Sequence, residues 1–404
     1  MSFDFTSIID RHGKDAIAVD GLGSGGAAPE PPERGFDAIP MWVADMNFPT
    51  CPSITQAIIE RAEHPAFGYF DPTDVYWQAI IDWQRARNGV EDLERAHIGY
   101  ENGVLGGVIS TIAAFAAPGD AVLLHSPTYI GFTKSITGSG YRIVHSPLMR
   151  DEAGVWRMDF EDMERKLAEG NVHVAVFCSP HNPCGRVWER WEVERAMELY
   201  AKYQCVVISD EIWSDIILPG CGRKHVPTQS VSADARERTV ALYAPSKTFN
   251  LAGLVGSYHI IYNGYLRDRV CAQASKSHYN HMNVLSMHAL TGAYTEQGAA
   301  WLDELCGVLG QNVDYACRVV EERFPGVSCA KPEGTYMLFL DCTEWCQAHG
   351  QTIDDVLRAG WRVGVAWQDG RAFNGPCHIR VNLALPHSRV VEAFDRLERH
   401  VFVD

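Results

Sequence analysis

Two stretches of the 404-residue chain, VVISDEIWSD at residues 206–215 and VALYAPSKTFN at residues 240–250, decide the fold. Each begins with a short apolar run and continues into a polar cluster rich in turn residues. The same pattern occurs in AVLLHSPTY at residues 121–129 and in VHVAVFCSPHNPCG at residues 172–185. Short runs that are apolar on both faces are typical of buried parallel strands, which are connected by helices.

Segments with helical periodicity separate these runs, and this alternation predicts an α/β layer with a mainly parallel central sheet. The clearest segments cover residues 52–61, 76–87, 104–116 and 192–203. After residue 285 the pattern predicts one long helix, residues 286–323, and then strands at residues 336–341, 364–367 and 378–383. This part is predicted to form a smaller α+β domain. The Gly- and Pro-rich residues 21–35 are predicted to form a surface loop.

Composition narrows the class of protein. The chain is 46% apolar, has a formal net charge of −16 and contains 12 scattered cysteines. The negative charge argues against nucleic acid or an anionic membrane as a partner, so an enzyme acting on a small molecule is expected. The N-terminal residues lack the pattern of a signal peptide, and no apolar run is long enough to span a membrane. We therefore expect a cytoplasmic protein with reduced cysteines and no bound metal.

Lys247 and Asp210 each stand at the end of a predicted buried strand, where a charged side chain is unusual. An amine at Lys247 can form a Schiff base with an aldehyde cofactor, and desolvation lowers its pKa into a useful range. A carboxylate at Asp210 needs a cation. A protonated pyridine nitrogen would supply that cation and would make the ring an electron sink. The alternatives are a surface lysine for Lys247 and a helix N-cap or salt-bridge partner for Asp210.

Three further elements fit a cofactor site but are weaker signals when taken alone. The rigid turn of residues 179–185 can present the Asn182 amide to a phenolate oxygen, and Tyr129 is placed to stack on a planar ring. The N–H groups of Val104 and Leu105 open a predicted helix and can hold a phosphate. The alternatives are an isolated turn, a tyrosine at the edge of the core and a plain glycine turn.

Arg380 lies within the otherwise apolar strand of residues 378–383. It alternates with Ile379 and Val381, so its side chain points to the opposite face of the strand. A planar guanidinium is well suited to bind a substrate carboxylate through two hydrogen bonds. The alternative is a structural salt bridge to an acidic residue of the protein.

In this order, the clusters resemble the pyridoxal-phosphate (PLP) enzymes of fold type I, the aspartate aminotransferase superfamily. Within it, MWVADM at residues 41–46, FGY at 67–69, SKTFN at 246–250 and GAAW at 298–301 are similar to the MalY/PatB group of carbon-sulfur lyases, the cystathionine beta-lyase group. The resemblance extends over nearly the whole chain. It implies an α/β fold with a large PLP-binding domain, residues 51–285, whose mainly parallel sheet is of the seven-stranded type. Residues 1–50 and 286–404 are expected to form the small α+β domain.

The resemblance also implies that pyridoxal 5'-phosphate is the cofactor, and it assigns a role to each candidate residue. The catalytic roles go to Lys247, which bonds the cofactor aldehyde, Asp210, which pairs with the pyridinium nitrogen, and Tyr129, which stacks on the ring. The other cofactor contacts are Asn182 at the ring 3-oxygen, the N–H groups of Val104 and Leu105, the hydroxyl of Ser246, and Trp213 and Tyr69. The substrate contacts are Arg380, which takes the carboxylate, Trp42 and Asn182. Because Tyr69 would reach the phosphate of a neighbouring subunit, the resemblance implies a homodimer with composite active sites.

Four positions depart from the patterns of related enzymes. Asn47 stands where the group usually has an acid, and Trp213 replaces the tyrosine of aminotransferases or the histidine of several lyases. Val255 stands where many aminotransferases carry a phosphate-binding arginine, and Ala244 lacks a hydroxyl. A less charged phosphate site and an indole beside the ring favour a lyase over a transaminase.

The function predicted from the sequence is therefore a PLP-dependent β-lyase that acts on a small amino-acid substrate. It would cleave cystathionine or related cysteine S-conjugates to a thiol, pyruvate and ammonia. A PLP-dependent aminotransferase is the alternative, and a regulatory binding protein that has kept the fold is a third hypothesis. Fold alone does not separate the two enzyme reactions.

Overall fold

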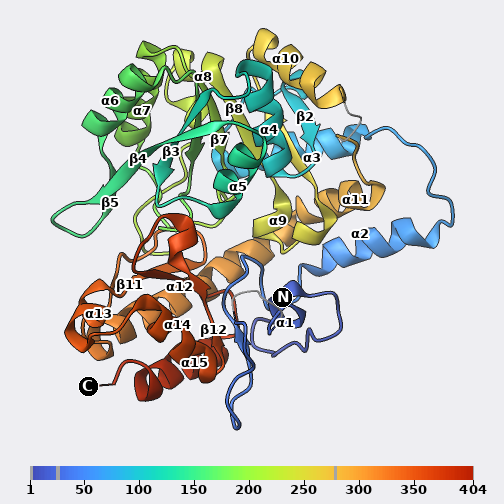
Figure 1. The fold of residues 1–404 in the computed structure, drawn as a ribbon. Helices are drawn as coiled ribbons and strands as arrows, with labels where there is room; N and C mark the ends of the chain where they lie inside the picture. The colour runs from blue at the N-terminus through green and yellow to red at the C-terminus, as the bar shows by residue number, and fades with distance from the viewer. Residues whose placement is uncertain (1–2, 24–27, 277–279, 404) are drawn as a thin grey trace.

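The computed structural model of the chain describes residues 3–23, 28–276 and 280–403. In these residues the main sheet has eight strands in the order β2-β9-β8-β7-β6-β3-β4-β5 (Figure 1). They are β2 (Ile98–Glu101), β3 (Ala121–Ser126), β4 (Arg142–Arg150), β5 (Trp156–Met158), β6 (Val174–Cys178), β7 (Val206–Asp210), β8 (Thr239–Tyr243) and β9 (Ser257–Ile260).

The predicted mainly parallel sheet is confirmed. The strands β8, β7, β6, β3 and β4 run parallel to their neighbours in this series. By contrast, β9 is antiparallel to both β8 and β2, and β5 is antiparallel to β4. The sheet has eight strands rather than the expected seven. The chain turns back after β4, and the short strand β5 pairs with β4 at the edge of the sheet.

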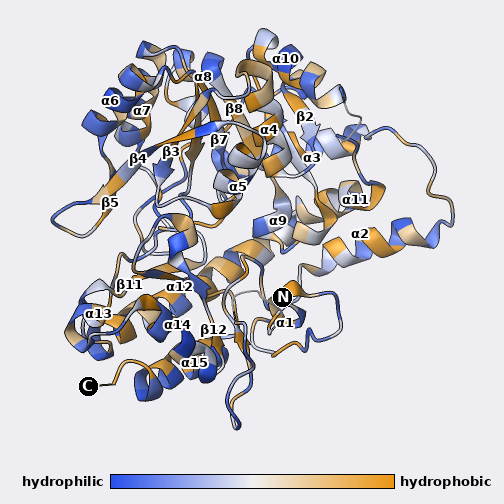
Figure 2. Cartoon of the chain, in the orientation of Figure 1, coloured by the Kyte–Doolittle hydropathy of each residue, from blue (hydrophilic) through white to orange (hydrophobic). Residues whose placement is uncertain are grey.

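Helices cover both faces of the main sheet because successive residues of each strand point to opposite faces. Val122 and Leu124 of β3 pack in one cluster with α4 (Val104–Phe115), α5 (Ile130–Gly138) and α10 (Gly264–Ser275). Ala121 and Leu123 pack in another cluster with α6 (Phe160–Gly170), α7 (Arg190–Lys202) and α8 (Ala233–Arg238). Figure 2 shows apolar residues along the central strands and many hydrophilic residues on the outer helices α6 and α7.

A second sheet, in the C-terminal part of the described chain, has the strand order β10-β11-β14-β13 and is antiparallel throughout. Its strands are β10 (Ser328–Cys329), β11 (Met337–Asp341), β13 (Gln368–Asp369) and β14 (His378–Asn382). The helices of this part are α12 (Glu296–Arg323), α13 (Thr343–His349), α14 (Ile353–Arg362) and α15 (His387–His400). The N-terminal segment joins it, because β1 (Ile39–Pro40) pairs in parallel with β12 (Val365–Ala366). The boundaries at residues 50 and 285 stay a prediction.

Two predicted elements are wrong in detail. The long helix over residues 286–323 is two helices, α11 (Val284–Ala293) and α12, because the Thr295 hydroxyl accepts a 3.0 Å hydrogen bond from Gly298 N and caps α12. A Cβ at Gly298 would lie 1.8 Å from the Ala293 carbonyl oxygen, so glycine permits this close turn. The strand over residues 364–367 is interrupted at Trp367, where the chain changes partner from β1 to β14.

The remaining helices are α1 (Ile17–Asp20), α2 (Pro52–Glu63), α3 (Asp74–Asn88) and α9 (Pro245–Thr248). Figure 1 shows α2 and the loop after it extending away from both sheets. In the predicted loop of residues 21–35, residues 21–23 and 28–35 contain no helix or strand, and residues 24–27 lie outside the described residues. Among the described helices, none combines the length and apolar character needed to cross a membrane.

Candidate active site

The carboxyl ends of β3, β6, β7 and β8 form one edge of the main sheet, and predicted site residues gather along it. Asp210 ends β7, Lys247 lies on α9 directly after β8, and Tyr129 and Asn182 follow β3 and β6. Ligands of parallel sheets bind at such an edge. Arg380 reaches this edge from β14, and its Nη1 lies 3.3 Å from Asn182 Oδ1. The two sheets therefore contribute to one site.

Lys247 is held on the four-residue helix α9, which begins at Pro245. Its Nζ donates a 2.6 Å hydrogen bond to the carbonyl of Ala44 and lies 5.7 Å from the centre of the Trp213 ring. Burial, and then the positive charge of Arg380, lower the pKa of Lys247 from 10.5 to about 8. The amine can therefore serve as a nucleophile or a base close to neutral pH, which is not the behaviour of a surface lysine.

Asp210 is 4% exposed, and no basic side chain of the described residues forms an ion pair with it. Its Oδ1 accepts a 3.1 Å hydrogen bond from the N–H of Ile212, which forms a local turn and not a helix cap. Burial raises the pKa of Asp210 from 3.8 to about 7. Neither alternative for Asp210 is therefore found. A cationic atom of a ligand placed here would favour the ionised carboxylate.

Arg380 is 3% exposed and faces only neutral partners in the described chain. Its Nη2 donates to the carbonyl of Trp42 at 2.9 Å and to Gln368 Oε1 at 2.6 Å, and its Nε has no partner there. Its guanidinium lies 4.4 Å from the centre of the Phe373 ring. Burial lowers the pKa of Arg380 to about 10. A buried cation without an acid is costly, so the arrangement fits an anionic ligand better than a structural salt bridge.

Tyr129 lies beside these groups at the start of α5, where its ring covers Gly131. A Cβ at position 131 would lie 2.3 Å from ring atom Cε1, so glycine is required for this ring position. Burial raises the pKa of the Tyr129 hydroxyl, and the charges of Arg380 and Asp210 also act on it. The Tyr129 side chain is therefore close to both charged residues, and its hydroxyl keeps its proton at neutral pH.

The start of α4 is the place where the sequence predicts a phosphate site. Gly103 precedes Val104 with φ +78°, and no side chain caps the helix, so the first N–H groups remain available. Beneath this turn, Glu101 Oε1 and His259 Nδ1 form a buried 2.7 Å ion pair. Burial lowers the pKa of His259, but hydrogen bonds with Cys271 and Glu101 outweigh it and raise the value to about 9. This pair, which the sequence analysis missed, fixes the strand that leads into the turn.

Val255 and Ser246 are two further residues that the sequence analysis singled out. Val255 is near Gly103, at 3.6 Å from the position a Cβ would take there, and it brings no positive charge. Ser246 is the residue before Lys247 on α9, and its carbonyl accepts a hydrogen bond from Leu251 N. Val255 therefore adds no positive charge beside the uncapped start of α4.

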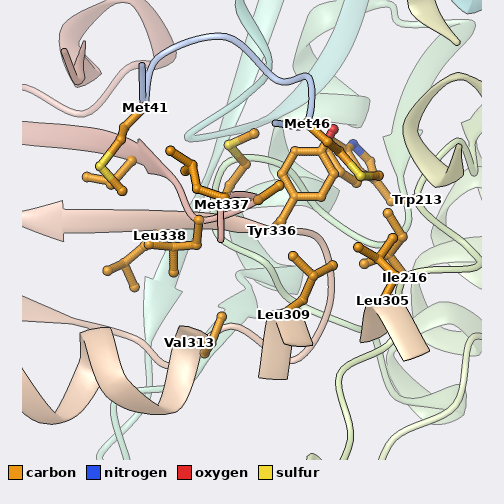
Figure 3. Close-up of a cluster of buried hydrophobic side chains, with 14 of the residues drawn as sticks. Met41, Met46, Trp213, Ile216, Leu305, Leu309, Val313, Tyr336, Met337 and Leu338 are labelled. Atoms are coloured by element: carbon orange, nitrogen blue, oxygen red, sulfur yellow. The ribbon is translucent and has the colours of Figure 1, made fainter. Parts of the chain in front are cut away.

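Aromatic side chains form a wall beside Lys247. The rings of Trp213 and Tyr336 meet edge to face with 4.8 Å between their centres. Figure 3 shows both rings beside Met46, at one end of a buried cluster that continues to Leu309 of α12. Trp42 is held by a 3.0 Å hydrogen bond from its Nε1 to the carbonyl of Ala18. The core fixes Trp213 and Tyr336, which are both buried, so the side of Lys247 that they cover is apolar.

Residues 41–47, here called the N-terminal strap, close over the site. Asn250 binds both backbone groups of Met46, at 3.0 and 2.9 Å, and the Asn382 amide donates to the carbonyls of Val43 and Asp45, each at 2.6 Å. The sequence analysis gave no role to Asn250, Asn382 or Gln368. The signal was available, because Asn250 lies in the SKTFN motif and Asn382 in the predicted strand of residues 378–383.

An ion pair anchors the far end of the strap. Arg11 Nη2 lies 2.6 Å from Asp45 Oδ2, and its Nη1 donates a 3.0 Å hydrogen bond to Asn47 Oδ1. An acid at position 47 would place a second carboxylate on Arg11, whereas Asn47 offers a neutral oxygen. The departure at Asn47 therefore leaves the Arg11–Asp45 pair intact.

Tyr69 does not lie at this site in the described chain. It lies in the loop between α2 and α3 and is fully exposed, and nearby Phe67 is 56% exposed. The loop lines an open cavity of about 510 Å³ together with Tyr100 and Met282.

Known proteins resemble this chain along nearly its whole length. Residues 38–397 match the family described as aminotransferase class I and II. The chain is 35% identical to cystathionine beta-lyase PatB of Bacillus subtilis, with 80% of this chain and 82% of PatB covered. It is 32% identical to protein MalY of Escherichia coli over 96% of each chain. The structure of cystalysin from Treponema denticola, which contains PLP, is 29% identical with a TM-score of 0.90, covering 99% of this chain and 98% of that chain. The chain therefore belongs to the class I and II aminotransferase family.

Proposed function

We propose that this protein is a PLP-dependent carbon-sulfur β-lyase that converts cystathionine or related cysteine S-conjugates into a thiol, pyruvate and ammonia. The proposal is carried by the buried grouping of an amine at Lys247, a carboxyl group without a cation at Asp210 and a cation without an acid at Arg380. These three groups match the aldehyde of PLP, its ring nitrogen and the carboxylate of an amino acid. The same assignment is supported by two relatives: PatB is named a cystathionine beta-lyase, and the structure of cystalysin contains PLP.

When bound, PLP withdraws electrons from the α-carbon of the attached amino acid. In this proposal the Nζ of Lys247 removes the proton from that carbon, and Asp210 keeps the proton on the ring nitrogen. Arg380 holds the α-carboxylate and so orients the bond that breaks. The β-thiolate then leaves with its bonding electron pair, and water converts the remaining three-carbon unit into pyruvate and ammonia.

The aromatic wall supports the lyase assignment. Trp213 and Tyr336 form a buried apolar wall next to Lys247, and such a wall suits a thioether substituent better than a second carboxylate. Val255 supports it too, because a lysine or arginine is absent from that position. An aminotransferase is the second candidate. It is favoured by the family match, since the same Lys247, Asp210 and Arg380 would serve both reactions.

Product analysis of the purified holoenzyme separates the two reactions. The enzyme is incubated with L-cystathionine and a series of cysteine S-conjugates without a keto acid, and thiol, pyruvate and ammonia are measured together. A lyase gives the three products in equal amounts over many turnovers, and Lys247→Ala gives none. Turnover that requires an added keto acid, without release of thiol, would assign the enzyme as an aminotransferase.

We also propose a homodimer with composite sites, in which Tyr69 of one subunit reaches the phosphate of the other. The exposure of Tyr69 and Phe67 on a loop that extends from the body supports it. Mixing Lys247→Ala subunits with Tyr69→Phe subunits then regenerates one site with both native residues in each heterodimer. Activity should rise above that of either variant alone, and a fully active monomer in sedimentation would contradict the proposal.

We keep two further proposals from the sequence. The large domain would cover residues 51–285 and the small domain residues 1–50 and 286–404, which the two separate sheets support. A cytoplasmic location is supported by the unpaired state of all twelve cysteines, each of which lies in the described part of the chain. Limited proteolysis tests the domain division, and cell fractionation tests the location.

A further inference from the structure

Two cysteines of the C-terminal part of the chain, Cys317 on α12 and Cys329 at the end of β10, face each other outside the proposed active site. Their sulfur atoms lie 3.9 Å apart. Both residues are only partly buried and neither is in a disulfide. A disulfide has an S–S length of about 2 Å, so side-chain rotation with a shift of roughly 2 Å would join the two sulfurs.

A cavity of about 320 Å³ opens beside this pair and is lined in part by Arg150, Cys184, Cys221, Cys329 and Lys331. This volume lies at the lower end of the range for small-molecule sites. Lys331 is paired with Asp314 at 2.6 Å. Arg150, in contrast, has no carboxylate partner in the described chain, and its Nε donates to the carbonyl of Gly154 at 3.1 Å. Glu333 also lines the cavity, but its carboxylate is already paired with Arg186 and Arg223. Arg150 therefore adds an unpaired positive charge next to a thiol, which favours a small anionic ligand.

The two thiols differ in character. The Cys317 thiol, and then the charge of Arg150, lower the pKa of Cys329, although burial opposes this. The pKa of Cys317 is raised, first by its interaction with Cys329 and then by burial. Because the thiolate is the nucleophile in exchange reactions, Cys329 is the attacking sulfur and Cys317 the resolving one.

We propose that Cys329 and Cys317 form a thiol–disulfide exchange site that accepts a small anionic disulfide in the adjoining cavity. In the first step, the Cys329 thiolate attacks one sulfur of the disulfide, and the other sulfur leaves as a thiolate. In the second step, Cys317 gives up its proton and attacks Cys329, so that the Cys317–Cys329 bond forms and the second small thiol leaves. The protein loses two hydrogen atoms, and the small disulfide is reduced to two thiols.

Other cysteines serve as controls because they lack one part of this arrangement. Cys221 lines the same cavity, but its sulfur accepts a 3.4 Å hydrogen bond from Arg223 N and has no thiol partner in the described residues. Cys184 also lines the cavity but is 3% exposed. Cys346 and Cys377 interact with each other, yet neither borders this cavity. They form the competing pair for oxidation.

The test uses the holoenzyme and oxidised glutathione, followed by intact mass and by peptide mapping without reduction. The expected product is a protein that is lighter by two hydrogen atoms and carries a bridge between Cys317 and Cys329. Cys317→Ser should stop at the first step and retain one glutathione on Cys329, whereas Cys329→Ser should give no bridge. Cys221→Ser should react as the wild type does. In glutathione the cysteine amine is in a peptide bond, so the outcome is independent of the proposed lyase reaction.

The role of the positive charge of Arg150 is tested by measuring the rate of the exchange reaction. Arg150→Gln should slow the reaction with oxidised glutathione about tenfold, because the anionic disulfide loses its attraction to the cavity. The rate with the uncharged bis(2-hydroxyethyl) disulfide should fall less. An unchanged lyase activity or an unchanged absorbance spectrum of the bound cofactor would show that Cys317→Ser is folded. A bridge between Cys346 and Cys377 instead, or glutathione on Cys221 with no loss of two hydrogen atoms, would overturn the proposal.

Discussion

Replacing Arg380 with lysine tests the substrate site most directly. In the free protein Arg380 has three hydrogen bonds, to Trp42, Gln368 and Asn182, and no acidic partner among the described residues. A bound α-carboxylate would be the first anion to reach this guanidinium. Lysine keeps the positive charge but loses the planar fork, so one of the two hydrogen bonds to the carboxylate is lost.

The size of the effect follows from the lost bond. A hydrogen bond between charged groups contributes about 1.5–3 kcal/mol, and 1.4 kcal/mol corresponds to a factor of about ten. The KM of Arg380→Lys should therefore rise about tenfold to 100-fold. Folding should change little, with a Tm within about 2 °C of the wild type. The hydrogen bonds that Arg380 loses go to neutral oxygens, and removing the buried guanidinium also removes the cost of its desolvation.

Arg186→Lys is the matched control. Arg186 is 2% exposed, as deeply buried as Arg380, but it pairs with Glu192 at 2.5 Å and with Glu333. This variant should lower the Tm by several degrees and leave the KM unchanged, because it breaks structural ion pairs. Steady-state kinetics and thermal melts are measured on both variants. If Arg380→Lys behaves as Arg186→Lys is expected to, with a lower Tm and an unchanged KM, Arg380 is structural and the carboxylate binds elsewhere.

Three further predictions concern Asp210 and Tyr129. Asp210→Asn should keep the visible absorbance of bound cofactor but lower kcat about 100-fold or more, because an amide does not hold the ring nitrogen protonated; a nearly native kcat would contradict this role. In the cofactor-free protein, the raised pKa of Asp210 gives stability that is present below pH 3.8 and lost as the pH rises through about 7. Asp210→Asn should therefore gain Tm relative to the wild type in melts from pH 4 to pH 8, and a constant difference would refute the shift. Gly131→Ala should displace the Tyr129 ring and weaken PLP binding about tenfold in titrations, whereas Gly138→Ala, with no atom within 4 Å of the new Cβ, should not.

The sequence was sufficient to place those candidate residues whose position depends on a single strand. Lys247 and Asp210 follow short apolar runs, so their placement at the edge of the sheet needs only the parallel arrangement of β7 and β8. Arg380 was predicted because it interrupts the apolar pattern of one strand. Each of these signals lies within about ten residues of the residue that it identifies.

The parts that the sequence analysis missed depend on contacts between distant segments. Any residue can supply the carbonyl that holds Lys247, and Ala44 does so because Asn250 and Asn382 bind the strap around it. The break between α11 and α12 is a different case. Thr295 and Gly298 were visible as a cap and a close turn, but the apolar periodicity on both sides suggested one helix. Tyr69 is fully exposed in the described chain, so its position at a site stays a prediction.

The charges of Lys247, Asp210 and Arg380 explain why the same residues that weaken the fold prepare it for its ligand. Burial shifts the pKa of all three groups toward the neutral form, Lys247 to about 8, Asp210 to about 7 and Arg380 to about 10. Each shift means that the folded protein disfavours the charged form relative to water. A ligand that brings a carboxylate to Arg380 and a protonated ring nitrogen to Asp210 supplies the missing partner for both. Binding should therefore stabilise the fold by mass action and by making the charged forms of Arg380 and Asp210 favourable again. The apolar wall of Trp213 and Tyr336 would strengthen both ion pairs by keeping water away from them.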